Sequence, residues 1–226
     1  MAAERQGDSG YRLKFHETLG PATQMAIVTN LLKSRLQGDL GPPLSPRRKT
    51  PMILYLMRHA NAGTVRENPT LDLKRGLVKD GKEQCMLMAR VLGAMKAPID
   101  VIVSSPLKRA RQTAQLVGTE LGYDSQVEVS EALGLNGSYS AFQDLLVKYA
   151  DREGVLAVGH NPNLFQFLGR LTTGNGAASI RMRKGSIARV DLSNHPPRLQ
   201  MLIDPRTARA IYASVTKSSR PKTSRK

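Results

Sequence analysis

The stretch MILYLMRHA at residues 52–60 decides the fold of this chain of 226 residues. Its apolar run ends at Met57 and is followed at once by Arg58 and His59. A continuous apolar run of this kind is typical of a strand buried on both faces, as in a parallel sheet. The run is far shorter than the roughly 20 residues that a membrane-spanning helix needs. The stretch therefore predicts a buried strand whose carboxyl end carries an arginine and a histidine.

Shorter apolar runs follow this first strand, and helical patterns separate them. The further predicted strands cover residues 101–103, 127–129, 155–158, 186–192 and 199–203. The predicted helices, in which apolar residues recur with helical spacing, cover residues 82–95, 106–121, 141–149 and 162–171. Strands that alternate with helices are typical of an α/β domain with a mostly parallel sheet. We therefore predict an α/β fold for residues 51–214.

Two of the predicted helices have marked starts. Ser105–Pro106 and Asn161–Pro162 each place a capping side chain before a proline at the first helical position. Both pairs follow a predicted strand, so both helix N-termini should lie at the carboxyl edge of the sheet. Open α/β sheets bind ligands at that edge, and the free N–H groups of a helix N-terminus favour an anion.

The net charge of +16 is concentrated towards the ends of the chain. Residues 1–50 hold eight basic and four acidic residues, and residues 217–226 hold five basic and no acidic ones. We interpret 1–50 as a flexible N-terminal extension and linker with one helix at 21–36, and 215–226 as a disordered basic tail. The alternative is a tail that binds a polyanion, although nucleic acid is not a favoured partner.

Composition narrows the classes of function. Aromatic residues make up 4% of the chain and Trp is absent, which argues against a stacking platform for bases or sugars. The one cysteine, Cys85, can form neither an internal disulfide nor a cysteine-based metal cluster. The sequence does not open with a secretory hydrophobic region. We expect a cytoplasmic protein that makes no membrane contact.

Arginines and histidines follow three of the predicted strands. Arg58 and His59 follow the first, Arg109 stands one helical turn after the second, and His160 follows a later one. Taken singly, each could be an ordinary surface or core residue. Together they should gather at one edge of the sheet, where arginine offers a fork of donors to phosphate oxygens and histidine serves as nucleophile or donor. The pattern predicts a pocket for a tetrahedral anion.

Three motifs resemble the histidine phosphatase superfamily: LMRHANA at 56–62, SPLKRARQTA at 105–114 and VGHNPNL at 158–164. The signature of that family is Arg-His-Gly after the first strand, a Ser-Pro-x-x-Arg-Ala-x-x-Thr segment and a later Gly-His. Arg75–Gly76–Leu77 and the strand KGSIARVDL add to the likeness. The motifs are most similar to those of the small bacterial phosphohistidine phosphatases of the SixA type. Ala60 departs from the usual glycine, and we expect its methyl group to reduce the room beside the histidine.

The resemblance implies a three-layer α/β sandwich, with the mostly parallel sheet flanked by helices, and a phosphatase that needs neither metal nor cofactor. It implies that His59 attacks phosphorus and becomes phosphorylated. Arg58, Arg109 and His160 would hold the phosphoryl oxygens, and Asn61 in the first motif is a further candidate for substrate binding. The sequence also lacks the clustered carboxylates that a Mg²⁺ site prefers.

The proton donor is the least marked part of the predicted site. Larger members of the superfamily place an acidic residue between the second arginine and the second histidine. Glu131 is the candidate here, with Glu128 and Asp144 behind it, although the small type is expected to lack a dedicated donor. An N–P bond needs less acid assistance than a phosphate ester, because protonated imidazole is a good leaving group.

Three functions stay open at this point. The leading hypothesis is a phosphatase that acts on phosphohistidine in a protein, such as a histidine phosphotransfer domain. The second is a phosphatase of the same mechanism that acts on a small phosphomonoester. The third is a module that binds phosphate or a polyanion without turnover, which the intact set of Arg58, His59, Arg109 and His160 argues against. The sequence does not indicate an oligomeric state.

Overall fold

The computed structural model describes residues 3–6, 10–13, 52–174 and 179–218. The chain divides into two units, residues 1–48 and 49–226, close to the boundary predicted at residue 50. In the first unit, β1 (Ala3–Gln6) and β2 (Gly10–Leu13) form an antiparallel pair that the sequence analysis did not predict. The helix predicted at 21–36 lies outside the described residues.

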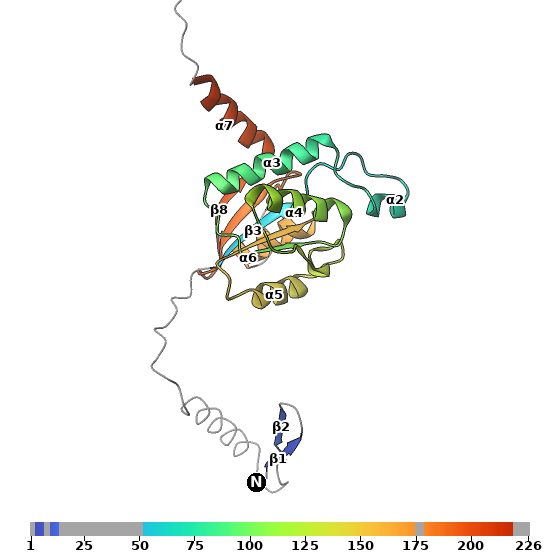
Figure 1. Cartoon of the computed structure of the whole chain (residues 1–226), viewed down its shortest axis with the longest axis vertical. Helices are drawn as coiled ribbons and strands as arrows, with labels where there is room; N and C mark the ends of the chain where they lie inside the picture. The colour runs from blue at the N-terminus through green and yellow to red at the C-terminus, as the bar shows by residue number, and fades with distance from the viewer. Residues whose placement is uncertain (1–2, 7–9, 14–51, 175–178, 219–226) are drawn as a thin grey trace, which may run out of the picture. The chain divides into compact units, whose positions relative to one another are not determined.

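The second unit is built on a six-stranded sheet with the strand order β5-β4-β6-β3-β7-β8 (Figure 1). Its strands are β3 (Ile53–Arg58), β4 (Val101–Ser104), β5 (Glu128–Val129), β6 (Gly154–Gly159), β7 (Ile187–Asp191) and β8 (Arg198–Ile203). The first four pair in parallel, whereas β7 and β8 join the sheet by antiparallel pairing. This confirms the predicted α/β fold and all six predicted strands.

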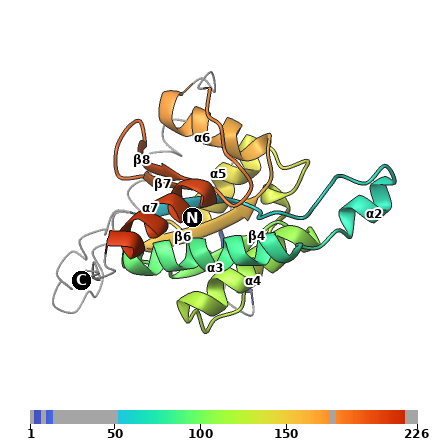
Figure 2. The same ribbon diagram turned by 90° about the horizontal axis from the view of Figure 1, so that it is seen from above.

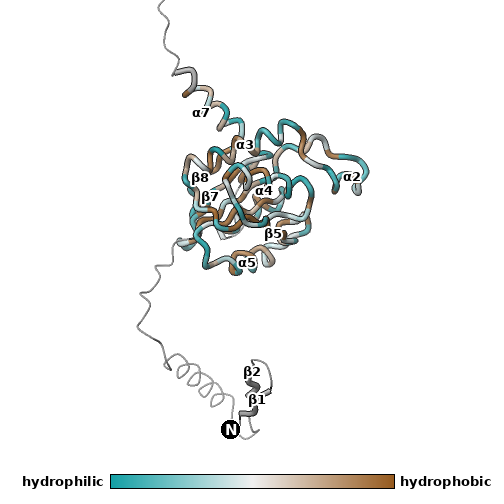
Figure 3. Tube along the Cα trace, in the orientation of Figure 1, coloured by the Kyte–Doolittle hydropathy of each residue, from teal (hydrophilic) through white to brown (hydrophobic). Residues whose placement is uncertain are grey.

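Helices cover both faces of the sheet, so the unit has three layers (Figure 2). The helices are α3 (Lys79–Ala94) and α4 (Lys108–Leu121) on one face, and α5 (Tyr139–Lys148) and α6 (Asn163–Thr173) on the other. A hydrophobic core lies on each face of the sheet, and alternate side chains of β3 pack into one or the other. Leu54 and Leu56 pack with α5 and α6, while Tyr55 and Met57 pack with α3 and α4. Figure 3 shows the hydrophobic segments gathered in the middle of this unit.

Both helices begin slightly later than predicted, α4 by two residues and α6 by one. Helix α4 begins at Lys108 with Leu107 as its N-cap, and α6 begins at Asn163 with Pro162 as its N-cap. Neither N-cap makes a side-chain capping bond. Ser105 and Asn161, which were expected to cap these helices, instead use their side chains in contacts around the candidate site.

Two helices were absent from the prediction. Helix α2 (Pro69–Leu73) buries no side chain and stands out from the body of the unit in Figures 1 and 2. Helix α7 (Pro205–Ser218) contributes Ala208 to the core on the α3 side and continues past the boundary predicted at residue 214. The rest of the predicted basic tail, 219–226, lies outside the described residues. Within the described part of the chain, no helix combines the length and apolarity that crossing a bilayer requires.

Candidate active site

The carboxyl ends of β3, β4 and β6 bring the predicted residues together. Arg58 at the end of β3 pairs in register with Gly159 at the end of β6, so His59 and His160 follow at the same level of the sheet. The backbone N–H of His59 donates to the carbonyl of Gly159 at 3.0 Å, which holds the two strand ends together. The two imidazole rings lie with their centroids 5.0 Å apart and their planes tilted by 52°.

The tautomer of His59 follows from its hydrogen bond. Nδ1 lies 2.8 Å from the carbonyl oxygen of Ala60, and a carbonyl oxygen can only accept. In the neutral ring Nδ1 therefore carries the proton and Nε2 keeps its lone pair. Burial, together with the charges of Arg109, Arg58 and Arg75, lowers the pKa of His59 to about 3, although the backbone bond acts in the opposite direction. His59 is thus neutral near pH 7, in the form that a nucleophile needs.

His160 is buried beside it, with an exposure of 2%. Its Nε2 lies 2.8 Å from the hydroxyl oxygen of Ser105, which also accepts a bond from the backbone N–H of Leu107. Burial lowers the pKa of His160 to about 3, with added repulsion from His59, Arg109 and Arg58. Its Nδ1 is buried and has no hydrogen-bond partner among the described residues.

Arg58 and Arg109 each donate one hydrogen bond from the guanidinium group to a backbone carbonyl. Nη1 of Arg58 donates to the carbonyl oxygen of Met182 at 2.9 Å, and Nη1 of Arg109 donates to that of Asp72 at 3.1 Å. Nε of each guanidinium is buried without a hydrogen-bond partner in the described chain. Buried donors without partners are rare and call for a functional explanation. Here they can bind the oxygens of an anion beside His59.

Asp72 was missed by the sequence analysis, and it forms ion pairs with both Arg109 and Arg75. Its Oδ2 lies 3.7 Å from Nη1 of Arg109, and its Oδ1 lies 2.9 Å from Nε of Arg75. A bond from the backbone N–H of Arg66 and the charge and bonds of Arg75 lower the pKa of Asp72, so it stays ionised. Arg75 in turn donates to the carbonyl of Ala62, which closes the loop after β3. Asp72 therefore orients an arginine and is not a source of protons.

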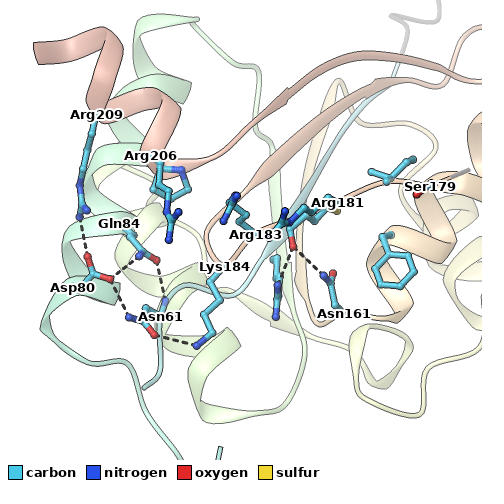
Figure 4. A pocket seen from close by; sticks show the side chains of 15 residues that line it. Asn61, Asp80, Gln84, Asn161, Ser179, Arg181, Arg183, Lys184, Arg206 and Arg209 are labelled. Carbon is cyan, nitrogen blue, oxygen red and sulfur yellow. Dashed lines mark hydrogen bonds and ion pairs between the residues drawn. The ribbon is translucent and has the colours of Figure 1, made fainter. Parts of the chain in front are cut away.

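Asn61 has its side-chain amide occupied by neighbouring groups. Nδ2 donates to Oδ2 of Asp80 at 3.0 Å, and Oδ1 accepts a bond of 3.2 Å from Nζ of Lys184 (Figure 4). Lys184 also donates to the carbonyl of Gly63, and burial together with Arg75 and Arg58 lowers its pKa. Asn61 therefore holds Lys184 close to the site, and its predicted contact with substrate stays a prediction.

Two further expectations concern Glu131 and Ala60. Glu131 begins a short 3-10 helix (Glu131–Leu133) and is exposed, and its carboxylate has no ion pair or hydrogen bond among the described residues. Its role as a proton donor therefore stays a prediction. Ala60 is fully buried and belongs to the core on the α3 side, and its N–H donates to Oγ1 of Thr113. Its methyl group is thus accommodated by the core.

Comparisons with known proteins agree with this geometry. A family model described as the histidine phosphatase superfamily (branch 1) matches residues 54–134. The phosphohistidine phosphatase SixA of Escherichia coli (strain K12) is 32% identical over 129 residues, which are 54% of this chain and 76% of SixA. The chain belongs to the histidine phosphatase superfamily. It is therefore a phosphatase, and the resemblance seen in its three motifs is confirmed.

Solved structures of other phosphatases share the fold. The protein histidine phosphatase SixA in complex with tungstate has a TM-score of 0.62 and 26% identity, and the match covers 69% of this chain and 98% of that one. The alpha-ribazole phosphatase of Shigella flexneri matches with a TM-score of 0.53 and 18% identity over 68% of this chain and 98% of its own, which shows the fold alone.

Proposed function

We propose that this histidine phosphatase removes phosphate from phosphohistidine in a protein, through a phosphohistidine intermediate on His59, in the cytoplasm. The single observation that carries the proposal is the state of His59, a neutral ring whose Nδ1–H is held by a carbonyl. Nε2 is then the only ring atom free to attack phosphorus. The name of the E. coli relative and the tungstate complex of SixA support a substrate with a tetrahedral oxyanion, because tungstate is such an ion.

In the first step, the lone pair of Nε2 of His59 forms a bond to phosphorus while the N–P bond of the substrate breaks. The electron pair of that bond stays on the substrate imidazole, which leaves as a neutral ring when its other nitrogen already carries a proton. In the second step, water attacks the phosphorus on His59, releases inorganic phosphate and restores the neutral ring. Imidazole needs no strong acid to leave, so the proposed mechanism requires no proton from Glu131.

Arg58, Arg109 and His160 act on the charge of the phosphoryl oxygens. Catalysis of phosphoryl transfer consists largely of positioning and of electrostatic stabilisation of these oxygens. The guanidinium groups of Arg58 and Arg109 stay charged and are fixed on backbone carbonyls, so they are oriented before substrate binds. They supply the positive charge that Mg²⁺ supplies in other phosphoryl-transfer sites, which is why we propose that no metal is required.

The proposal is tested by trapping the intermediate. A peptide with a radiolabelled phosphohistidine is mixed with the protein and denatured within milliseconds at alkaline pH, where phosphohistidine survives. We expect label on the wild-type chain and none on His59→Asn, with turnover by that variant lost. A folded His59→Asn variant that still hydrolyses the peptide would exclude His59 as the nucleophile. Sugar phosphates and nucleotides assayed in parallel distinguish a small phosphomonoester as the preferred substrate.

Removal of metal ions tests the role of the arginines. Rates measured in excess EDTA and in excess Mg²⁺ are expected to agree, whereas Arg58→Ala and Arg109→Ala should each lower the rate about 10²- to 10³-fold, the usual loss for one transition-state donor. A strict requirement for Mg²⁺ would contradict the proposed mechanism.

A further inference from the structure

A cavity of about 690 Å³ opens beside the phosphoryl site. Arg58 and Asn61 belong to its lining, so the cavity is continuous with the end of β3. Its other walls come from α3, from residues 179–184 and from the start of α7 (Figure 4). Two of these walls, residues 179–183 and α7, had no role in the sequence analysis. The volume is within the range of about 300–1,000 Å³ that ligand sites occupy.

The lining is strongly cationic. One acidic side chain, that of Asp80, lines the cavity together with six basic ones. The basic side chains are those of Arg58, Arg181, Arg183, Lys184, Arg206 and Arg209. Arg209 pairs with Asp80 at 3.0 Å, and Arg183 lies 3.4 Å from a carboxylate oxygen of Asp204. Arg181 and Arg206 are exposed residues, and they have no carboxylate partner among the described residues. The cavity therefore carries positive charge that the described part of the protein does not neutralise.

We propose that this cavity binds acidic side chains that flank the phosphohistidine of the protein substrate. The inference rests on the proposed function and adds a second point of recognition to it. A guanidinium group matches the two oxygens of a carboxylate with a fork of donors. Phe165 and Ile180, which are partly buried, also line the cavity, and they can pack against the aliphatic part of a Glu or Asp side chain. A purely inorganic polyanion would leave these apolar contacts unused.

The exposed positions of Arg181 and Arg206 predict that recognition of acidic flanks changes the rate at which substrate binds. Arg181 and Arg206 are exposed at the rim, so they act on a substrate before it is fully bound, and opposite charges at such positions raise the rate of association. Their effect should fall as salt rises, because ions screen exposed charges over about 8 Å at physiological ionic strength. Acidic flanks should therefore raise kcat/KM, chiefly at low salt.

The test compares two short peptides that differ only beside their phosphohistidine, where one has glutamates and the other glutamines. We expect the wild-type protein to hydrolyse the glutamate peptide with a kcat/KM about tenfold higher at low salt, which corresponds to a few exposed ion pairs. The double variant Arg181→Gln/Arg206→Gln should bring this ratio close to one. The double variant Arg181→Glu/Arg206→Glu should favour the glutamine peptide.

Arg198→Gln is the matched control. Arg198 is exposed and pairs in register with Asp191 at the opposite, amino edge of the sheet, so its loss removes one arginine charge far from the cavity. This variant should keep the wild-type ratio. Equal hydrolysis of both peptides by wild-type protein would overturn the inference and leave the proposed function intact. Hydrolysis of neither peptide would instead refute the proposed function. If the arginine variants lower only the turnover of a small bisphosphate, the cavity serves a small polyanion and the inference is wrong.

Discussion

Arg109 is a charged side chain with an exposure of only 4%, and Asp72 is the carboxylate beside it. When the side chain of Asp72 is changed, the hydrogen bond from Arg109 to the backbone carbonyl of Asp72 is kept, but the negative charge beside Arg109 is lost. Asp72→Asn should therefore lower kcat about tenfold and change KM little, because the guanidinium is held less firmly in the transition state. Asp151→Asn, which removes an exposed charge at the amino edge of β6, should leave both constants unchanged.

The role of Glu131 is decided by the leaving group. On a phosphohistidine peptide, Glu131→Gln should retain kcat within about twofold, because a protonated imidazole leaves without acid assistance. The comparison to make is kcat for this variant on the peptide and on an alkyl phosphate, whose alkoxide needs a proton. A loss of more than about tenfold on the peptide would identify Glu131 as the proton donor after all.

At the scale of elements, the site depends on how closely α3 approaches the loop after β3. A Cβ atom on Gly81 would lie 2.0 Å from the carbonyl oxygen of Asn61, and because this oxygen belongs to the backbone it can give way only if the loop moves. In the same helix, a Cβ atom on Gly93 would meet only Leu121, at an ordinary distance of 3.9 Å. The first glycine is thus required by packing and the second is not.

Gly81→Ala should therefore lower the free energy of unfolding by about 1–3 kcal/mol and reduce activity, because the loop that carries Asn61 must shift. Gly93→Ala should raise the free energy of unfolding by up to about 1 kcal/mol, since alanine is the better helix former. Urea unfolding of both variants, with kcat measured alongside, checks the pair. Equal stability of the two variants would contradict the close packing of α3.

For the whole molecule, the two buried histidines link stability to pH. Burial holds the pKa of both His59 and His160 near about 3 in the folded protein, below the ordinary value of 6.5. Between these values the unfolded chain binds more protons than the folded one. Stability is therefore complete above about pH 6.5 and declines as pH falls through this window.

In this pH window, each histidine should take up about one proton when the chain unfolds. The unfolding equilibrium constant should then change about tenfold per pH unit for each histidine. We expect His160→Asn to flatten the acid side of the stability curve by that amount, measured by urea unfolding between about pH 4 and pH 6. His195→Asn changes an exposed histidine and should keep the wild-type slope. An unchanged slope in His160→Asn would show that His160 is protonated in the folded state.

The sequence alone was enough to predict the strands of the sheet and most of the helices. It also predicted that Arg58, His59, Arg109 and His160 gather at one edge of that sheet. These follow from local signals: apolar runs, helical spacing and short motifs at the ends of strands. The starts of α4 and α6 could not be predicted from the same signals. Ser105 turns its hydroxyl towards His160 as well as the backbone, and Asn161 donates to the carbonyl of Met182.

Only the tertiary structure decided the orientation and charge of the site. Arg58 is held by the carbonyl of Met182, 124 residues away, and Arg109 is held by Asp72 on a short helix without buried side chains. The cationic cavity likewise joins β3 and α3 to residues 179–184 and to α7. No local pattern marks such contacts, because they form only when the packing of the sheet brings distant segments to one edge. The tautomer and low pKa of His59 depend on that same burial.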